Sequence, residues 1–369
     1  MAQSNLLRLR NLWFQIHKWI GILLAIVIIP VSLSGSALVW HDWLDETVNP
    51  QRHATAAPAL SPGAYAAAAQ KALAPGERVM TITYPHHEGP VVVTAARPPV
   101  EGERRPVRTL LYLDPADARL IDKDTNSEGV VRFLHVLHGS LQVPGVGRQI
   151  VGWIGVFMLI SSLTGIWLWW PVTGSVRRGF RWRRQPDTNA NLHHLFGFWI
   201  ALPLAMLSFT GVWISFPGVF GPLVGAPAPR PPQAPAQPLA VTALGPDGAV
   251  SLATPIAEGP LTSIGWPTDK ASEWKIGYRR EGGGGTAEVQ VDDVSAKVTP
   301  AKPPQPETVA RLMRRLHDGT GMGALWQTII FIGGIIPALL AVTGILMWLR
   351  SRRWRGDVAR RQAENRAAV

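Results

Sequence analysis

The chain of 369 residues contains no cysteine. This absence excludes disulfides, thiol redox chemistry, iron–sulfur clusters and covalent haem attachment through a C-x-x-C-H motif. No catalytic triad is recognisable, and the run Gly282–Gly285 lacks the Lys-Ser/Thr ending of a phosphate-binding loop. The long apolar runs of the chain contain no aspartate or glutamate, so they offer no buried carboxylate for proton-coupled transport.

Four stretches of the chain carry no charged residue at all. Each is long enough to cross a hydrocarbon core of ~30 Å, which takes about 20 residues of helix. The sequence therefore predicts an α-helical membrane protein with four transmembrane helices. The four stretches are about Trp19–Trp40, Gln149–Pro171, Leu192–Val224 and Gly319–Leu349.

The net charge of +11 is distributed unevenly along the chain. The N-terminus, the short connection between the second and third stretches, and the C-terminal tail hold 15 of the 36 basic residues and three acids. The two long connections are close to neutral. This asymmetry is the positive-inside pattern, and it predicts cytoplasmic termini, an inner-membrane location and two long outer segments. It argues against nucleic acid as a partner and for membrane lipid.

Each long connection is expected to form a small α+β module. The first begins with an alanine-rich helix over Ala64–Leu73, and the second opens with a proline-rich linker over Gly225–Pro238. The predicted strands are Val79–Tyr84, Val91–Ala95, Thr109–Leu113, Leu261–Gly265, Glu273–Tyr278 and Glu288–Val291. The resulting segments are 1–43 with the first transmembrane helix, 44–147 as the first module, 148–216 with the second and third helices, 217–318 as the second module, and 319–369 with the fourth helix and the basic tail.

The chain also repeats itself, and the repeat preserves histidines. The motif H-K-W-I-G at His17 corresponds to H-H-L-F-G at His193, and each histidine precedes a Ser/Thr-Gly pair whose glycine is 18 residues further on. His138 and His317 likewise each precede a Thr-Gly pair whose glycine is 27 residues further on. These matches predict two related halves that each contribute one histidine to two sites.

Two pairs of imidazoles suit two b-type haems, each with two axial histidines, better than zinc, which prefers three or four clustered donors. The predicted haem-iron ligands are His17 with His193 and His138 with His317. Alternative ligands remain open at His194, which adjoins His193, and at His135 and His41, which have no histidine at the corresponding repeat positions.

Local spacing adds two expectations about these histidines. Because 18 residues make about five helical turns, His17 shares a helix face with Gly35, which would admit a flat macrocycle or another helix. Short helices are expected over Gly129–Leu137 and Glu307–Leu316, directly before His138 and His317, because a glycine that suits a helix end follows each histidine closely.

At these motifs the chain resembles the PepSY-associated transmembrane family. The resemblance rests on H-x-W-x-G at His17, the Ser/Thr-Gly pair late in each apolar stretch, L-H-G at His138, L-H-D-G at His317, and outer segments with a helix followed by strands. It implies periplasmic PepSY-like insertions. It also implies similarity to inner-membrane ferrisiderophore reductases that bind two haems.

The function predicted from this resemblance is a haem b oxidoreductase that passes electrons across the membrane to a periplasmic ferric chelate. The electron donor would be a quinol or a cytosolic flavin reductase. Two alternatives stay open: a non-catalytic membrane-anchored PepSY protein that binds or regulates a partner, and a carrier of haem or metal.

Overall fold

The computed structural model describes residues 2–98, 106–170, 181, 187–225, 234–280, 285–303 and 307–367. The described chain forms two compact units, one helical and one built on a sheet. The helical unit comprises residues 1–41, 133–229 and 307–369, and the sheet unit comprises 42–132 and 230–306. Most of the short basic connection, most of the glycine run and part of the proline-rich linker predicted above lie outside the described residues.

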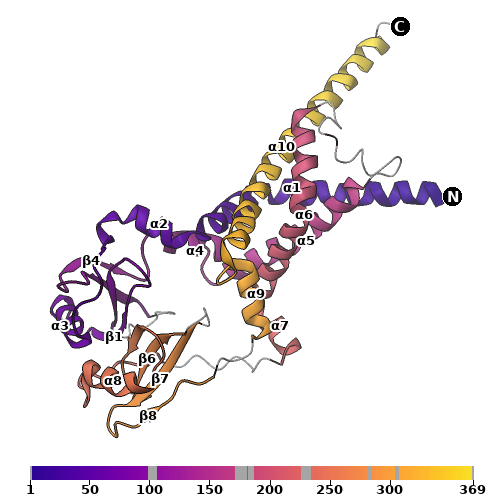
Figure 1. Ribbon diagram of the computed structural model, residues 1–369. Coiled ribbons are helices and arrows are strands. Elements are labelled where there is room, and N and C mark those ends of the chain that lie inside the picture. The colour runs from indigo at the N-terminus through magenta and orange to yellow at the C-terminus, as the bar shows by residue number, and fades with distance from the viewer. Residues whose placement is uncertain are drawn as a thin grey trace. The chain divides into compact units, whose positions relative to one another are not determined.

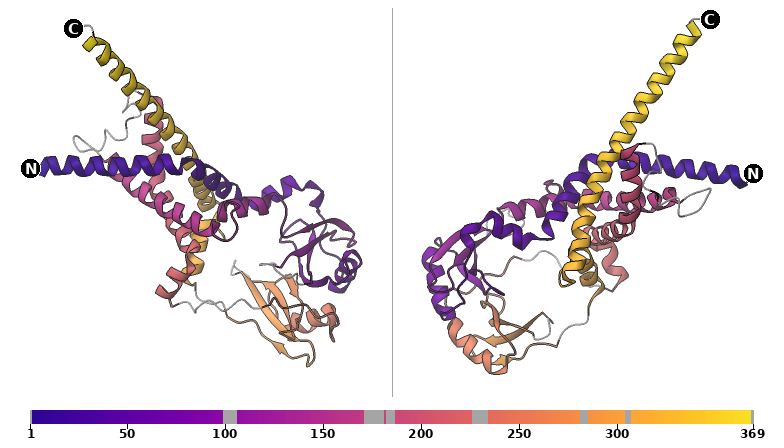
Figure 2. Two further views of the ribbon diagram at one scale, coloured as in Figure 1. Left: turned by 180° about the vertical axis from the view of Figure 1, so that it is seen from behind. Right: turned by 45° about the horizontal axis from the view of Figure 1, so that its top comes forward.

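Each of the four apolar stretches corresponds to a helix that is long and apolar enough to cross a membrane. The third stretch, predicted as Leu192–Val224, is interrupted at Phe216, where one helix ends and a short one begins, and the fourth helix begins at Gly323 and not at Gly319. The long helices α1 and α10 contain 37 and 45 residues, so both extend well beyond the length that a bilayer requires. In the views of Figures 1 and 2, their free ends project from the same end of the helical unit. The helices of this unit are α1 (Ala2–Leu38), α4 (Val130–Ser140), α5 (Gly147–Trp169), α6 (Thr188–Ser215), α7 (Pro217–Leu223), α9 (Val309–Asp318) and α10 (Gly323–Ala367).

The four long helices pack in a closed ring in which α1 contacts α5 and α10, and α6 contacts the same two helices. Small residues allow close approach at several crossings. At Gly334 of α10, for example, an added Cβ would lie 2.7 Å from the backbone oxygen of Ser32 in α1. Close packing of this kind holds membrane helices together, because lipid provides no hydrophobic force between them.

The two short helices α4 and α9 end differently. Helix α9 stops at Asp318, and Gly319 adopts a left-handed conformation with φ 80°, as its glycine predicts. The helix predicted over Gly129–Leu137 ends three residues later than expected: α4 continues through His138 and Gly139 to Ser140. The chain then turns through Leu141 and Gln142, both with positive φ.

The sheet unit contains one antiparallel sheet of eight strands in the order β4-β3-β2-β1-β5-β6-β7-β8. The six predicted strands are confirmed, and the sequence did not predict β4 or β8. The strands from the two long connections meet where β1 pairs with β5, with Ile82 opposite Ile264. The strands are β1 (Arg78–Thr83), β2 (Val91–Ala96), β3 (Arg108–Leu113), β4 (Leu120–Thr125), β5 (Leu261–Gly265), β6 (Glu273–Arg279), β7 (Thr286–Asp292) and β8 (Val298–Thr299).

Two helices, α3 (Pro62–Ala72) and α8 (Gly245–Ala253), pack against the sheet and against each other. The predicted alanine-rich helix is confirmed as α3, which begins at Pro62 with Ser61 as its N-cap. Asp247 of α8 accepts a hydrogen bond from the backbone N–H of Gly63 at 2.8 Å, so α8 also caps α3. The core beneath them includes Tyr65, Ile82 and Trp274. The remaining short elements are α2 (His41–Val48), η1 (Pro50–Arg52) and η3 (Thr254–Ile256).

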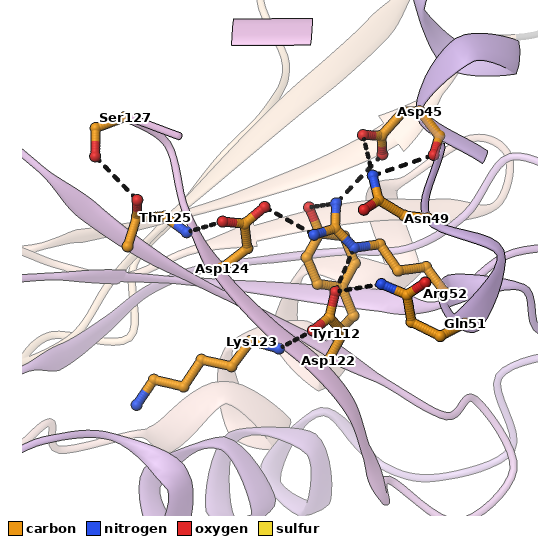
Figure 3. A network of polar contacts seen from close by, with 10 residues as sticks. All are labelled: Asp45, Asn49, Gln51, Arg52, Tyr112, Asp122, Lys123, Asp124, Thr125 and Ser127. Carbon is orange, nitrogen blue, oxygen red and sulfur yellow. Dashed lines mark hydrogen bonds and ion pairs between the residues drawn. The ribbon is translucent and has the colours of Figure 1, made fainter. Parts of the chain in front are cut away.

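A nearly buried arginine joins the start of the sheet unit to strand β4. Arg52 donates to the carboxylates of Asp122 at 2.6 Å and Asp124 at 2.7 Å, and its guanidinium lies 4.1 Å from the ring centroid of Tyr112 (Figure 3). Asp45 adds a more distant ion pair at 3.5 Å. Although burial opposes the charge, these partners raise the pKa of Arg52. The cluster holds η1 against the edge strand.

Arg52→Ala is expected to destabilise the sheet unit by about 3 kcal/mol, because it leaves partly buried carboxylates without their cation. Thermal unfolding and hydrogen exchange of β3 and β4 in the full-length protein measure the loss. Arg119→Ala is the matched control. Its ion pair with Asp114 is 3.7 Å long and two-thirds exposed at the arginine, so its loss is expected to cost no more than about 1 kcal/mol. Equal effects of the two substitutions would contradict a structural role for the Arg52 cluster.

Candidate functional site

Four histidines of the helical unit form two pairs. His17 of α1 and His193 of α6, here called the first pair, have ring centroids 6.4 Å apart with an angle of 86° between the rings. His138 of α4 and His317 of α9, the second pair, have centroids 5.9 Å apart with an angle of 42°. The structure thus brings together the four histidines that the repeat singled out, in the two predicted combinations.

In the first pair, a neighbouring helix holds each ring through Nδ1. The Nδ1 of His17 lies 3.1 Å from the backbone oxygen of Ser161 and 3.1 Å from Oγ1 of Thr164, both in α5. The Nδ1 of His193 lies 3.0 Å from Oγ1 of Thr343 in α10. That hydroxyl donates its own hydrogen to the backbone oxygen of Leu339, so it accepts from the histidine.

In the second pair each ring is also held through Nδ1, but by the other two long helices, α1 and α6. The Nδ1 of His138 donates to the backbone oxygen of Val31 in α1 at 2.8 Å. The Nδ1 of His317 lies 3.1 Å from the backbone oxygen of Leu207 and 3.0 Å from Oγ1 of Thr210, both in α6.

These hydrogen bonds fix the tautomer of the rings. A backbone oxygen can only accept, so the proton sits on Nδ1 and the lone pair of Nε2 stays available. A metal-binding histidine typically donates its other ring N–H to such an acceptor, which orients the ring and raises its basicity. These contacts thus orient all four rings through Nδ1 and leave Nε2 as the nitrogen with a lone pair.

Each ring also lies against a glycine of the helix that holds it. An added Cβ would lie 3.4 Å from Cε1 of His17 at Gly165, 3.5 Å from His193 at Gly344, 3.1 Å from His317 at Gly211 and 2.5 Å from His138 at Gly35. The 18-residue spacing places His17 and Gly35 on one face of α1, but the two residues lie at different histidine pairs. Gly35 faces His138, and His17 faces Gly165, so each Ser/Thr-Gly pair receives a histidine from another helix.

The two pairs lie far apart along the helices. His17 and the Gly35 that contacts His138 are both in α1, and 18 residues of helix rise about 27 Å. This separation approaches the ~30 Å thickness of a hydrocarbon core, so the pairs lie near opposite ends of a membrane span.

The rings of the second pair, which lie outside the apolar helices, are kept neutral by their surroundings. Burial lowers the pKa of His138. Burial, and then the neighbouring charge of His138, lowers the pKa of His317 to about 4. Both rings are therefore uncharged near neutral pH, and neutral imidazole is the form that binds metal.

The spacing of both pairs suits one metal ion between two imidazoles. Two metal–nitrogen bonds of about 2.0 Å each, with half a ring at each end, place the ring centroids about 6 Å apart. Among the described residues, no group of three or more His, Cys, Asp or Glu side chains could hold a metal ion. The arrangement thus lacks the three or four clustered donors that zinc prefers.

The alternative ligands lie elsewhere. His194 stacks on Trp169 with ring centroids 6.1 Å apart, so His193, and not His194, faces His17. His41 and His135 lie next to each other, with centroids 6.3 Å apart. The sequence did not predict this third pair, because neither histidine has a histidine at the corresponding repeat position.

The chain matches one known protein family. The model of the PepSY-associated TM region matches residues 14–351, which is most of the chain. The protein therefore belongs to this family and is a membrane protein. No curated protein matches the chain at a significant level.

Proposed function

We propose that the protein is a haem b-containing inner-membrane reductase that passes electrons across the membrane to a periplasmic ferric chelate. The observation that carries the proposal is the pair of two-histidine sites near opposite ends of the apolar helices. In both sites the described contacts orient the rings through Nδ1 and leave Nε2 for a metal. A haem iron held by two imidazoles supplies one-electron transfer.

The residues of the chain fit such a group on three counts. The donor set is imidazole alone, with no thiolate in the sequence. The centroid spacings of 6.4 and 5.9 Å match two axial bonds to one ion. A glycine stands at each point where one of the four rings meets its neighbouring helix, so no side chain separates the ring from the helix backbone. Binding would thus use His17 with His193, and His138 with His317.

The pattern of contacts supports a chain of two related halves. His17 contacts α5 and His138 contacts α1, whereas His193 contacts α10 and His317 contacts α6. Each half thus orients its own two histidines, and each pair joins one ring from either half. Pairing across the halves makes both sites depend on assembly of the complete bundle.

The charge pattern supports the direction of transfer. With both termini in the cytoplasm, the first pair lies toward the cytoplasmic side and the second pair toward the periplasm. The sheet unit is then the product of two periplasmic PepSY-like insertions. A quinol or a cytosolic flavin reductase would donate electrons at the first pair.

The substrate proposal rests on coordination chemistry. Siderophores hold Fe(III) through hard oxygen donors, and the same donors hold Fe(II) less tightly. One-electron reduction therefore loosens the chelate. The second pair, on short helices outside the apolar spans, would let a bulky chelate approach without entering the bilayer.

A reoxidation experiment tests this function. The purified protein is reduced with dithionite, the excess reductant is removed, and a ferric siderophore is added under anaerobic conditions. The expected result is reoxidation of the haem absorption bands together with Fe(II) formation, trapped by a ferrous chelator. Haem bands that stay reduced would contradict the reductase and favour a haem carrier, and a protein that binds no haem would favour the non-catalytic binding protein.

A further inference from the structure

Helix α10 carries a stripe of exposed apolar side chains along its apolar part. The spacing alternates between three and four residues, which keeps the members on one helix face. The buried Ile330 and Pro337 lie on the opposite face. Because the protein belongs to a membrane family, the stripe is the face that α10 turns to lipid. Its members are Ile332, Ile335, Leu339, Val342, Leu346 and Leu349.

The same spacing continues beyond the apolar part of α10 to Arg353 and Arg360. Arg353 comes four residues after Leu349, and four residues of helix rise about 6 Å. The headgroup layer of a bilayer is roughly 5–8 Å thick on each side of the hydrocarbon core. Arg353 therefore lies at the depth of the lipid phosphates, on the face that the apolar stripe turns to lipid.

The arginines at this level differ in their contacts. Arg350 donates to Asp187, the N-cap of α6, and so ties α10 to that helix. Arg352 lies over the ring of Trp348, 5.0 Å from its centroid. Stacking occupies the face of that guanidinium and leaves the N–H groups in its plane for another acceptor. Arg353 is exposed, and no described residue makes a hydrogen bond or ion pair with its guanidinium.

We propose that Arg352 and Arg353 bind the phosphate of an anionic phospholipid at the membrane surface beside α10. Arginine presents planar forks of N–H donors that match phosphate oxygens. Basic clusters that directly follow a membrane-spanning helix attract anionic lipids. Trp348 and the exposed Trp354 flank the two arginines, and tryptophan rings favour the headgroup level.

The depth of the two arginines favours a lipid over an acidic protein partner. Arg360 and Arg361 lie about 16–18 Å of helix rise beyond Leu349, outside the headgroup layer. A partner in solution would meet these distal arginines first, whereas a lipid in the bilayer reaches the arginines next to the apolar stripe. The lipid site requires neither haem nor electron transfer, so it does not depend on the proposed function.

Spin-labelled lipids test the site in the full-length protein. The protein is reconstituted in phosphatidylcholine vesicles with a trace of spin-labelled phosphatidylglycerol or spin-labelled phosphatidylcholine, and electron paramagnetic resonance gives the fraction of each probe held at the protein. The unaltered protein is expected to prefer phosphatidylglycerol by about fivefold or more, since each basic residue near the surface contributes roughly that factor. Arg352→Gln/Arg353→Gln should reduce the preference to below about twofold.

Arg360→Gln/Arg361→Gln is the matched control, because it removes the same charge further from the bilayer. This variant should keep the preference, and so should Arg352→Lys/Arg353→Lys, which retains the charge at the site. Equal losses in the two glutamine variants would show a general attraction by the basic tail and overturn the proposal, as would an unaltered protein without preference. Binding of soluble poly-glutamate that Arg352→Gln/Arg353→Gln abolishes, with lipid preference unchanged, would assign the arginines to an acidic protein instead.

Discussion

His193→Ala is expected to remove one of two haems and to leave the other bound. The ring centroids of His193 and His17 lie 6.4 Å apart, and Thr343 holds Nδ1 of His193, so alanine deletes an oriented imidazole that we propose as an axial ligand. His17→Ala should remove the same haem, whereas His138→Ala and His317→Ala should each remove the haem of the second pair. Haem stoichiometry of the purified variants, measured with the reduced absorption spectrum, reports each loss.

His194→Ala provides the matched control for this prediction, because the neighbouring ring stacks on Trp169 and does not face His17. Both haems should remain in that variant. Added imidazole should restore the missing haem in His193→Ala, which distinguishes a lost ligand from a misfolded bundle. Unchanged haem content in all four ligand variants would defeat the assignment.

Gly35→Ala is expected to disrupt the second site as strongly as the loss of a ligand. The new Cβ would lie 2.5 Å from Cε1 and 2.7 Å from Nδ1 of His138, so the ring must leave its position and its hydrogen bond to Val31. Overpacking of this kind costs about 1–3 kcal/mol where neighbours have to shift. The expected result is loss or altered absorption of the haem at the second pair, with the first haem intact.

Gly21→Ala, in the same helix, is the control, since nothing lies within 4 Å of the added Cβ. It should leave both haems bound and can strengthen the helix by up to about 1 kcal/mol. At the first pair, the added Cβ of Gly165→Ala would lie 3.4 Å from His17, so this substitution should disturb its site less than Gly35→Ala does. A normal second haem in Gly35→Ala would show that this glycine does not govern the placement of His138.

Much of the fold follows from local patterns in the sequence. The apolar stretches predicted the four long helices, because length and charge alone decide whether a helix can span a bilayer. Alternation and β-branched residues predicted six strands, including the bounds of β5. Strand β4, with the sequence L-I-D-K-D-T, was missed because its charged residues are atypical of strands; its two aspartates bind Arg52.

Other features depend on contacts between separate segments of the chain. The spacing of residues along one helix does not reveal such contacts. The repeat predicted the histidine pairs because both copies retained the residue type. It could not show that Gly35 faces His138, since the helical period fixes a face but not its neighbour. The third pair was missed because it has no repeat copy, and the junction of β1 with β5 joins strands nearly 180 residues apart.

The central claim is that two pairs of imidazoles each hold a haem iron. The absorption spectrum of the protein, purified after haem-replete expression, tests it most directly. The expected spectrum shows a Soret band and a split α-band on reduction, with two non-covalent b-type haems per chain. A colourless protein would contradict it.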